Sequence, residues 1–260
     1  MTDRKQWRTG ASACFVGHID EGVMEDYAKA GVKSLELSFG WNPAYYLENV
    51  DWKMIPTWTR NTGTEVWSVH LPCSLSINEK NVESDVEILN RAGEAGVKVA
   101  LVHPSGEPIH DGERALRMER CSADFGKLCD AAKKTGITVA VEDLPRTCLC
   151  NCHEEIQYLL DRHPDLRVCY DTNHMLKESN EEFIRAVGKK IVTLHVSDFD
   201  FVDEKHLFPG DGFIDWKVLQ HELEKVDYNG PFMYEVGPKD RDGRRTLSDL
   251  RANHVWLMNL

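Results

Sequence analysis

The chain has 260 residues, with 31 lysines and arginines against 43 aspartates and glutamates, so its formal net charge is −12. Its 42% hydrophobic and 28% charged residues are typical of a globular protein with a sizeable core, which excludes wholesale disorder. The acidic balance disfavours a nucleic-acid partner, because a phosphate backbone is normally bound by a basic face. No apolar run approaches about 18 residues and no secretory pattern follows Met1, so we expect a cytoplasmic protein without a membrane-spanning helix.

Eight short apolar runs rich in β-branched residues recur along the chain and predict eight strands. In chain order they are residues 11–16, 34–39, 65–71, 97–103, 137–142, 166–171, 191–196 and 231–236. Between them, apolar residues recur at intervals of three and four, as at Val82, Val86 and Leu89, which predicts amphipathic helices. Several joints carry a glycine that is expected to take the left-handed conformation that ends a helix. These glycines are Gly31, Gly63, Gly96, Gly136, Gly188 and Gly230.

Continuous apolar strands that alternate with helices indicate a parallel sheet covered on its faces. Eight such units in 260 residues predict an α/β protein: a single (β/α)₈ barrel, the TIM barrel, with residues 1–260 as one domain. An open doubly wound sheet is the alternative. The nucleotide-binding fingerprint of such sheets is missing, because no Gly-x-Gly-x-x-Gly follows the first strand. We therefore expect no organic cofactor.

Polar residues collect at the carboxyl ends of the predicted strands, where barrels of this type carry their chemistry. The best set comes from four successive strands and consists of Glu142, Asp171, His195 and Glu235. Charged groups at the inner ends of apolar strands are costly unless they are paired or bind a metal. Three carboxylates and one imidazole favour one divalent ion, Mn²⁺ first, with Mg²⁺, Co²⁺ or Zn²⁺ as alternatives. The competing interpretation is that each side chain makes its own surface or loop contact.

The same arrangement suggests a reaction. The fifth and eighth strands lie three apart in an eight-membered ring, so Glu142 and Glu235 should approach a central ligand from different sides. A metal that holds a carbonyl and its adjacent hydroxyl polarises the C–H bond between them. One carboxylate would take that proton and the other would return it, to the opposite face or to the neighbouring carbon. We therefore predict a metal-dependent isomerase or epimerase of carbohydrates, with Glu142 and Glu235 as its acid/base pair.

Further side chains near the predicted strand ends are candidates for substrate contact. His70 and His103 follow the third and fourth strands, and each is equally compatible with a rim histidine that contacts only protein. His174, three residues after Asp171, should reach the same pocket from the following loop. Trp41 follows the second strand, where an aromatic ring either stacks on a sugar or packs under the next helix.

Other residues have competing structural interpretations. Glu36 lies inside the second strand, and we expect it to form a structural pair within the barrel. Arg146 is the nearest cation to the end of the fifth strand, where it would meet either an acidic substrate or a carboxylate side chain. Cys148, Cys150 and Cys152 offer soft ligands for Zn²⁺, but structural zinc sites favour two residues between paired cysteines. We expect reduced thiols in a loop.

Five short segments follow each other in order along the chain: VEDLP at 141–145, DTNH at 171–174, LHVSD at 194–198, PGDGFIDW at 209–216 and YE at 234–235. Together they resemble the xylose-isomerase-like barrel superfamily, in its branch of small sugar and sugar phosphate isomerases and epimerases. The resemblance implies that the residues at the positions of Glu142, Asp171, His195 and Glu235 bind one divalent metal. It also implies that the two glutamates transfer the proton, that His174 contacts the substrate, and that two barrels form a homodimer. The partner would be a small-molecule sugar or sugar phosphate.

Two alternatives follow from departures within this superfamily. Ketose epimerases of this branch carry an arginine shortly after the seventh-strand histidine, and residues 197–201 contain none. Other isomerases, or an inosose-type dehydratase, therefore stay open.

The chain also resembles the apurinic endonucleases, a branch that binds three zinc ions. Similar positions here are His70, His103, Glu142, Asp171, His174, His195, His206 and Glu235, with Glu204 where that branch has aspartate. A histidine such as His206, ahead of a Pro-Gly-x-Gly turn, is equally similar to many sugar isomerases, in which we expect it to contact the substrate. The charge of −12 argues against a DNA-binding face, so a zinc phosphodiesterase is the alternative function.

Overall fold

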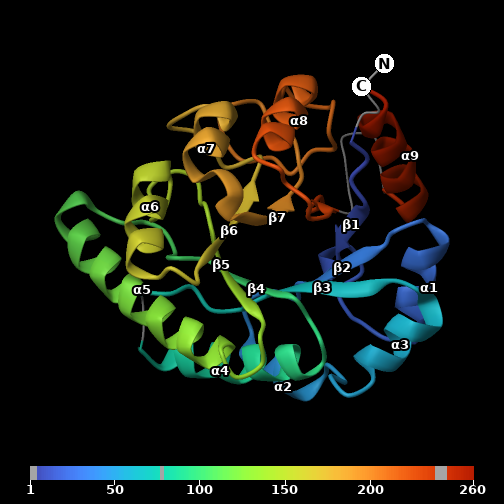
Figure 1. Cartoon of the computed structure of the whole chain (residues 1–260), viewed down its shortest axis with the longest axis horizontal. Coiled ribbons are helices and arrows are strands. Elements are labelled where there is room, and N and C mark those ends of the chain that lie inside the picture. Colours follow the sequence, from blue (N-terminus) through green and yellow to red (C-terminus); the bar gives the residue numbers. More distant parts are fainter. Residues whose placement is uncertain (1–4, 77–78, 238–244) are drawn as a thin grey trace.

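The computed structural model describes residues 5–76, 79–237 and 245–260, in which strands alternate with helices (Figure 1). The strands are β1 (Thr9–Ser12), β2 (Ser34–Leu37), β3 (Glu65–His70), β4 (Val99–Val102), β5 (Thr138–Glu142), β6 (Arg167–Asp171), β7 (Ile191–His195) and β8 (Phe232–Tyr234). The helices are α1 (Glu21–Lys29), α2 (Pro43–Glu48), α3 (Ile55–Thr62), α4 (Glu79–Glu94), α5 (Asp111–Ala132), α6 (His153–Arg162), α7 (Asn180–Val187), α8 (Trp216–Lys225) and α9 (Leu247–Met258). Short 3-10 turns cover Ala13–Phe15 and Gly188–Lys190. None of the helices in the described ranges has the length and hydropathy needed to traverse a lipid bilayer.

All eight strands belong to one parallel sheet, in the order β7-β6-β5-β4-β3-β2-β1-β8. A bridge between Val196 and Tyr234 links the two ends of this sheet. There, Val196 N donates to Met233 O at 2.7 Å, and Glu235 N donates to Val196 O at 3.2 Å. The sheet therefore curls into a nearly closed barrel ringed by helices (Figure 1). The TIM-barrel prediction is confirmed, and the open-sheet alternative is wrong.

The first strand lies earlier in the chain than the sequence predicted. It covers Thr9–Ser12 rather than residues 11–16, because Ser12 is the N-cap of the following 3-10 turn. The Ser12 hydroxyl accepts a hydrogen bond from Cys14 N at 3.3 Å, and such local bonds compete with pairing in a sheet. Residues after Ser12 consequently leave the sheet at the mouth of the barrel.

Most of the predicted glycine joints have the expected positive φ. These are Gly31, Gly63, Gly96 and Gly136. Gly188 also has a positive φ, of 53°, but its ψ of −130° lies outside the left-handed helical region. Gly230 does not have a positive φ, so that part of the prediction is wrong. A Cβ atom at Gly230 would lie 2.6 Å from the carbonyl oxygen of Val192, so this glycine instead allows the chain to pass close to β7.

The inner face of the barrel changes from apolar to polar toward the carboxyl ends of the strands. Side chains of a strand point alternately to its two faces, so inward positions recur every second residue. An interior apolar cluster lies deeper in the barrel and consists of Val99, Leu101, Ala140 and Cys169. Two residues after Ala140 and Cys169, the strands carry Glu142 and Asp171, and the register pairs Asp171 with His195. The apolar cluster therefore supports a polar layer at the mouth.

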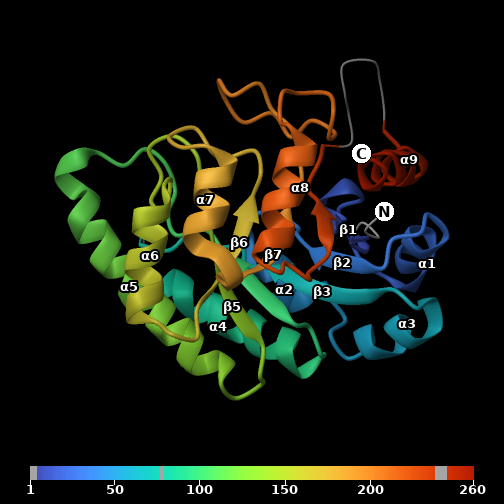
Figure 2. The same cartoon turned by 45° about the horizontal axis from the view of Figure 1, so that its top comes forward.

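A long connection, residues 196–215, joins β7 to α8 and rises beyond the helices at the top of Figure 2. The buried carboxylate of Asp198 organises this connection by accepting four hydrogen bonds. They come from the backbone N–H groups of Phe199, Gly210 and Ile214 and from the indole of Trp216. A Cβ atom at Gly212 would lie 2.4 Å from Asp198 Oδ1, so only glycine fits there. The structural reason for the PGDGFIDW segment is thus a turn built around one carboxylate.

Candidate functional site

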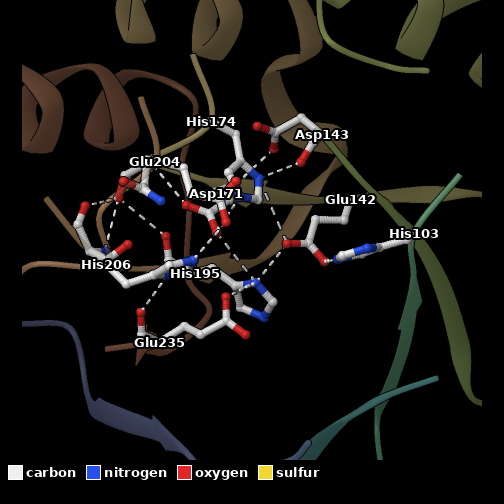
Figure 3. Close-up of polar contacts among 12 residues, drawn as sticks. His103, Glu142, Asp143, Asp171, His174, His195, Glu204, His206 and Glu235 are labelled. Carbon is white, nitrogen blue, oxygen red and sulfur yellow. Dashed lines mark hydrogen bonds and ion pairs between the residues drawn. The ribbon is translucent and has the colours of Figure 1, made fainter. Parts of the chain in front are cut away.

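Four side chains meet at the carboxyl ends of β5, β6, β7 and β8 (Figure 3). They are Glu142, Asp171, His195 and Glu235. His195 Nδ1 lies 2.9 Å from Glu142 Oε1, 3.1 Å from Glu235 Oε2 and 3.7 Å from Asp171 Oδ2. One potential ligand atom from each of the four lies within 4.8 Å of the others. The structure thus brings together the residues that the sequence grouped, and their spacing suits a shared cation.

Burial and charge compete at these carboxylates. Burial raises the pKa of Asp171, and the nearby His174 and His195 only partly oppose it. Burial also acts against ionisation of Glu235, but the facing His195 outweighs it and lowers the pKa of Glu235 to about 2. Glu142 Oε2 and Asp171 Oδ2 are among the buried side-chain atoms that make no hydrogen bond within the described residues, although imidazole nitrogens face them at 3.3 to 3.5 Å. Buried polar atoms normally have partners, so these two oxygens fit a bound cation.

A fifth buried side chain, Glu36 of β2, orients His195. His195 Nε2 lies 3.0 Å from Glu36 Oε1, and the Ser68 hydroxyl donates to Glu36 Oε2 at 2.7 Å. A carboxylate that accepts from Nε2–H leaves Nδ1 as the nitrogen turned toward the other carboxylates. The expected structural pair of Glu36 within the barrel is confirmed, but the sequence did not identify its partner.

Three more histidines, His70, His174 and His206, share one orientation. Each Nδ1 lies within 3.1 Å of a backbone carbonyl oxygen, which must accept a hydrogen from it. The carbonyls belong to Leu71, Asp143 and Glu235, in that order. Each Nε2 then faces a carboxylate at 3.2 to 3.5 Å, respectively Glu142 Oε2, Asp171 Oδ2 and Glu204 Oε1. Burial opposes protonation, but the facing carboxylates outweigh it and raise the pKa of His70 to about 9 and that of His206 to about 10. These two Nε2 atoms therefore carry a proton unless a bound cation takes the lone pair, as in metal-ligating histidines.

A cavity of about 270 Å³ opens above this layer. All five predicted substrate contacts line it: Trp41, His70, His103, His174 and His206. The indole of Trp41 is 59% exposed, and its ring centroid lies 4.8 Å from that of His103. Trp41 therefore packs on an imidazole at the mouth and still presents surface to a ligand, rather than being buried under the next helix.

Side chains that could ligate a metal also form two further groups, one on either side of the central four residues. One is His70, His103 and Glu142, and the other is His174, Glu204 and His206. Glu142 belongs both to the first group and to the central one, because its Oε2 faces His70 and His103 at 3.3 Å while its Oε1 faces His195. The chemistry of these side chains thus allows more than one divalent ion.

Residues 24–255 match the family model described as the xylose isomerase-like TIM barrel. The chain belongs to this family. A ketose 3-epimerase from Arthrobacter globiformis is 23% identical over 59% of this chain and 56% of that protein. The chain spans 55% to 63% of the length of the curated relatives that it matches.

Solved structures of proteins named as sugar epimerases or as epimerase-like have the same fold. A D-tagatose 3-epimerase-like protein superposes with a TM-score of 0.79 at 20% identity, covering 97% of this chain and 98% of that one. A 3-keto-D-glucoside 4-epimerase from E. coli superposes with a TM-score of 0.76 at 17% identity, covering 98% and 100% of the two chains. At such low identity these similarities establish the fold alone.

Some pocket residues of this xylose isomerase-like barrel were not expected from the sequence. Cys14, which is exposed, and Ser38 both line the cavity, and neither was identified as a candidate from the sequence. Cys14 lies at the mouth because the first strand ends at Ser12. A predicted first strand that ended at Ser12 would have indicated that Cys14 lies at the mouth of the barrel.

Arg146 and the loop cysteines also have defined surroundings. Arg146 makes ion pairs with Glu107, Asp203 and Glu204, so the carboxylate interpretation of this arginine is confirmed. The thiols of the β5–α6 loop take no part in the potential ligand groups found within the described ranges. They belong to Cys148 and Cys150, which are buried, and to Cys152, which is half-buried.

Proposed function

We propose that this protein is a divalent-metal-dependent isomerase or epimerase of sugars. The observation that carries the proposal is the approach of Glu142 and Glu235, from β5 and β8, to within 3.1 Å of the same His195 nitrogen. Two carboxylates beside a common centre suit a reaction that removes a proton and returns it elsewhere. The names of the similar ketose and keto-glucoside epimerases support a carbohydrate substrate.

The central donor set fits a hard divalent ion, for which Mn²⁺ is our first choice. Glu142, Asp171, His195 and Glu235 would hold it, and the two orphaned oxygens at Glu142 and Asp171 support this assignment. When bound, such an ion makes a sugar carbonyl more electrophilic and the neighbouring C–H bond more acidic. No organic cofactor enters the proposal.

The chain's own part in the reaction is proton transfer and positioning. One of Glu142 and Glu235 takes the proton from the carbon beside the carbonyl. The other, protonated in the substrate complex, gives one to the opposite face or to the neighbouring carbon. The Nε2 atoms of His70, His174 and His206 would orient substrate hydroxyls, with His103 beside them. The exposed face of Trp41 would stack on the sugar ring.

Proton exchange with solvent tests this proposal. Incubation of the Mn²⁺-loaded protein with candidate ketoses in D₂O should place deuterium on one carbon of the product. Glu142→Gln and Glu235→Gln should each lower turnover by about 10²- to 10⁴-fold, the usual cost of losing a general acid or base. Metal content measured on each variant separates loss of the ion from loss of proton transfer. Undiminished turnover in both variants would overturn the roles, and a product that has lost water would identify a dehydratase instead.

A second candidate function is a zinc phosphodiesterase of the apurinic-endonuclease type. It is favoured by one observation, the presence of three neighbouring groups of potential metal ligands. Glu142 belongs both to the group with His70 and His103 and to the central group, and His174, Glu204 and His206 form the third. Metal analysis distinguishes the two. About one ion per chain with ketose turnover supports the isomerase, and about three zinc ions with cleavage of abasic DNA supports the hydrolase. The net charge of −12 is the reason that we rank the hydrolase second.

Two broader expectations stay predictions. A homodimer is expected from the branch that the sequence resembles, and a cytoplasmic location is expected from the sequence alone. Neither enters the mechanism, because every residue proposed for the reaction comes from one chain. Light scattering of the purified protein would measure the oligomeric state.

A further inference from the structure

Arg146 connects three loops at the mouth of the barrel. It lies in the β5–α6 loop, where its Nε donates to Asp203 Oδ1 at 2.7 Å. Its Nη1 lies 3.2 Å from Glu107 Oε2 in the β4–α5 loop and 2.9 Å from Glu204 Oε2 in the β7–α8 connection. The planar guanidinium can serve several carboxylates at once, which the point charge of a lysine cannot. One cation therefore joins three anions that would otherwise repel each other.

The ion pairs of Arg146 form a network that reaches the wall of the cavity. Glu204, which pairs with Arg146 through Oε2, uses Oε1 to face His206 Nε2 at 3.2 Å. Both Glu204 and His206 line the cavity, and His206 Nδ1 contacts the backbone oxygen of Glu235 at 3.1 Å. A displacement of Glu204 would therefore move the imidazole that faces the predicted substrate.

The backbone conformations of two residues in this network indicate that contacts, rather than local conformational preference, determine the arrangement. Arg146 has φ of 53° and His206 has φ of 49°, values that L-residues other than glycine rarely adopt. Such conformations persist where the surrounding contacts determine them, and they cluster at functional sites. Glu107 is itself fixed, because Thr147 N and the Thr147 hydroxyl both donate to Glu107 Oε1 at 3.1 Å.

We propose that Arg146 is a positioning residue that holds residues 203–206 of the β7–α8 connection against the cavity, so that Glu204 and His206 keep their places in its wall. The argument about the loop rests on contacts alone, and only its effect on turnover rests on the proposed function. Arg146 is not among the residues that line the cavity, and it acts on the cavity wall through its ion pair with Glu204.

A matched pair of arginine variants tests the proposal. Arg146→Gln removes the network, and Arg146→Lys retains a charge but not the planar fork. Arg185→Gln is the control, because Arg185 forms a similar pair with Glu222, between α7 and α8 and away from the cavity. Thermal unfolding of each variant shows whether it is folded.

Loop position is measured first, without any substrate. Lys205 lies inside the held segment and its side chain is 43% exposed, so trypsin can report local opening there. Arg146→Gln should speed cleavage after Lys205 by about tenfold, Arg146→Lys by less, and Arg185→Gln should not change it. Cleavage that is equally fast in wild type and Arg146→Gln would overturn the proposal, whatever the reaction proves to be.

Turnover of the ketose identified in the deuterium experiment gives the second readout. Arg146→Gln should raise KM by about tenfold while kcat changes less, because the wall residues move and Glu142 and Glu235 stay in place. A fall in kcat with unchanged KM would contradict a positioning role at the wall. Absence of ketose turnover in wild type would contradict the proposed function only, since the trypsin measurement decides the loop question independently.

Discussion

His195 and Glu36 are joined by a contact of 3.0 Å between Nε2 and Oε1, buried inside the barrel between β7 and β2. This contact decides which imidazole nitrogen faces Glu142 and Glu235. Metal-ligating histidines commonly donate their other ring N–H to a carboxylate, and loss of that partner typically weakens metal binding by about 10- to 100-fold. We therefore expect Glu36→Gln to weaken Mn²⁺ binding by that factor, as measured by competition with a metal-sensitive dye.

Ser68→Ala is the control for this prediction. It removes the hydrogen bond to Glu36 Oε2 and leaves the contact with His195 intact, so its effect on Mn²⁺ affinity should be smaller. Unchanged affinity in Glu36→Gln would mean that the negative charge of Glu36 is not needed to support the imidazole as a ligand. Because affinity is measured without a substrate, the result does not depend on which sugar is turned over.

Asp198 is the basis of a second prediction, which concerns stability. Its buried carboxylate accepts from three backbone N–H groups and the Trp216 indole. Removing a buried acceptor leaves its donors unsatisfied, at a cost of about 1–3 kcal/mol for each group. Asp198→Ala should therefore lower the free energy of unfolding by at least about 3 kcal/mol in a urea titration. Asp198→Asn keeps the shape and one acceptor oxygen, so it should lose less.

Val202→Ala in the same connection provides the comparison, since Val202 is 78% exposed. Its loss should cost well under half as much as the loss of Asp198. Equal losses in Asp198→Ala and Val202→Ala would show that the connection is not organised around the buried carboxylate.

The sequence predicted most of the barrel because burial imposes a pattern that is visible in the chain. Each of the eight apolar runs contains or overlaps an observed strand, since parallel strands covered on both faces must be apolar throughout. The boundary of the first strand was wrong because the local bond from Cys14 N to the Ser12 hydroxyl, rather than hydropathy, ends the strand. Local hydrogen bonds of this kind leave no periodic signal.

The candidate site was predicted in part for a related reason. Glu142, Asp171, His195 and Glu235 could be grouped because parallel strands place their carboxyl ends at one rim. The partner of Glu36 could not be identified, because β2 and β7 are not neighbours in the sheet and their side chains meet only across the barrel interior. The carbonyl contacts of the three histidines likewise depend on loop conformations that the residue pattern does not specify.

The last prediction concerns His254 in α9, which packs against the amino-terminal segment. Its ring is buried, its Nε2 donates to Trp7 O at 3.1 Å, and burial lowers its pKa to about 4. The unfolded chain, with an ordinary histidine pKa near 6.5, therefore takes up a proton at a higher pH than the folded protein does. As the pH falls from 6.5 to 4, this difference should remove about 3 kcal/mol of stability, and below pH 4 the contribution levels off because both states are protonated.

Urea unfolding of the metal-free protein at pH 7.5, 5.5 and 4.5 measures this effect in wild type and in His254→Gln. The first pH lies above both pKa values and the other two lie roughly between them. The glutamine variant can still donate to Trp7 O but cannot titrate, so wild type should lose more stability on acidification than the variant. His221→Gln, on the exposed side of α8, controls for the removal of an imidazole. Parallel losses in wild type and His254→Gln would mean that the folded protein admits a charged His254, and acid sensitivity would then have to arise at the carboxylates of the site.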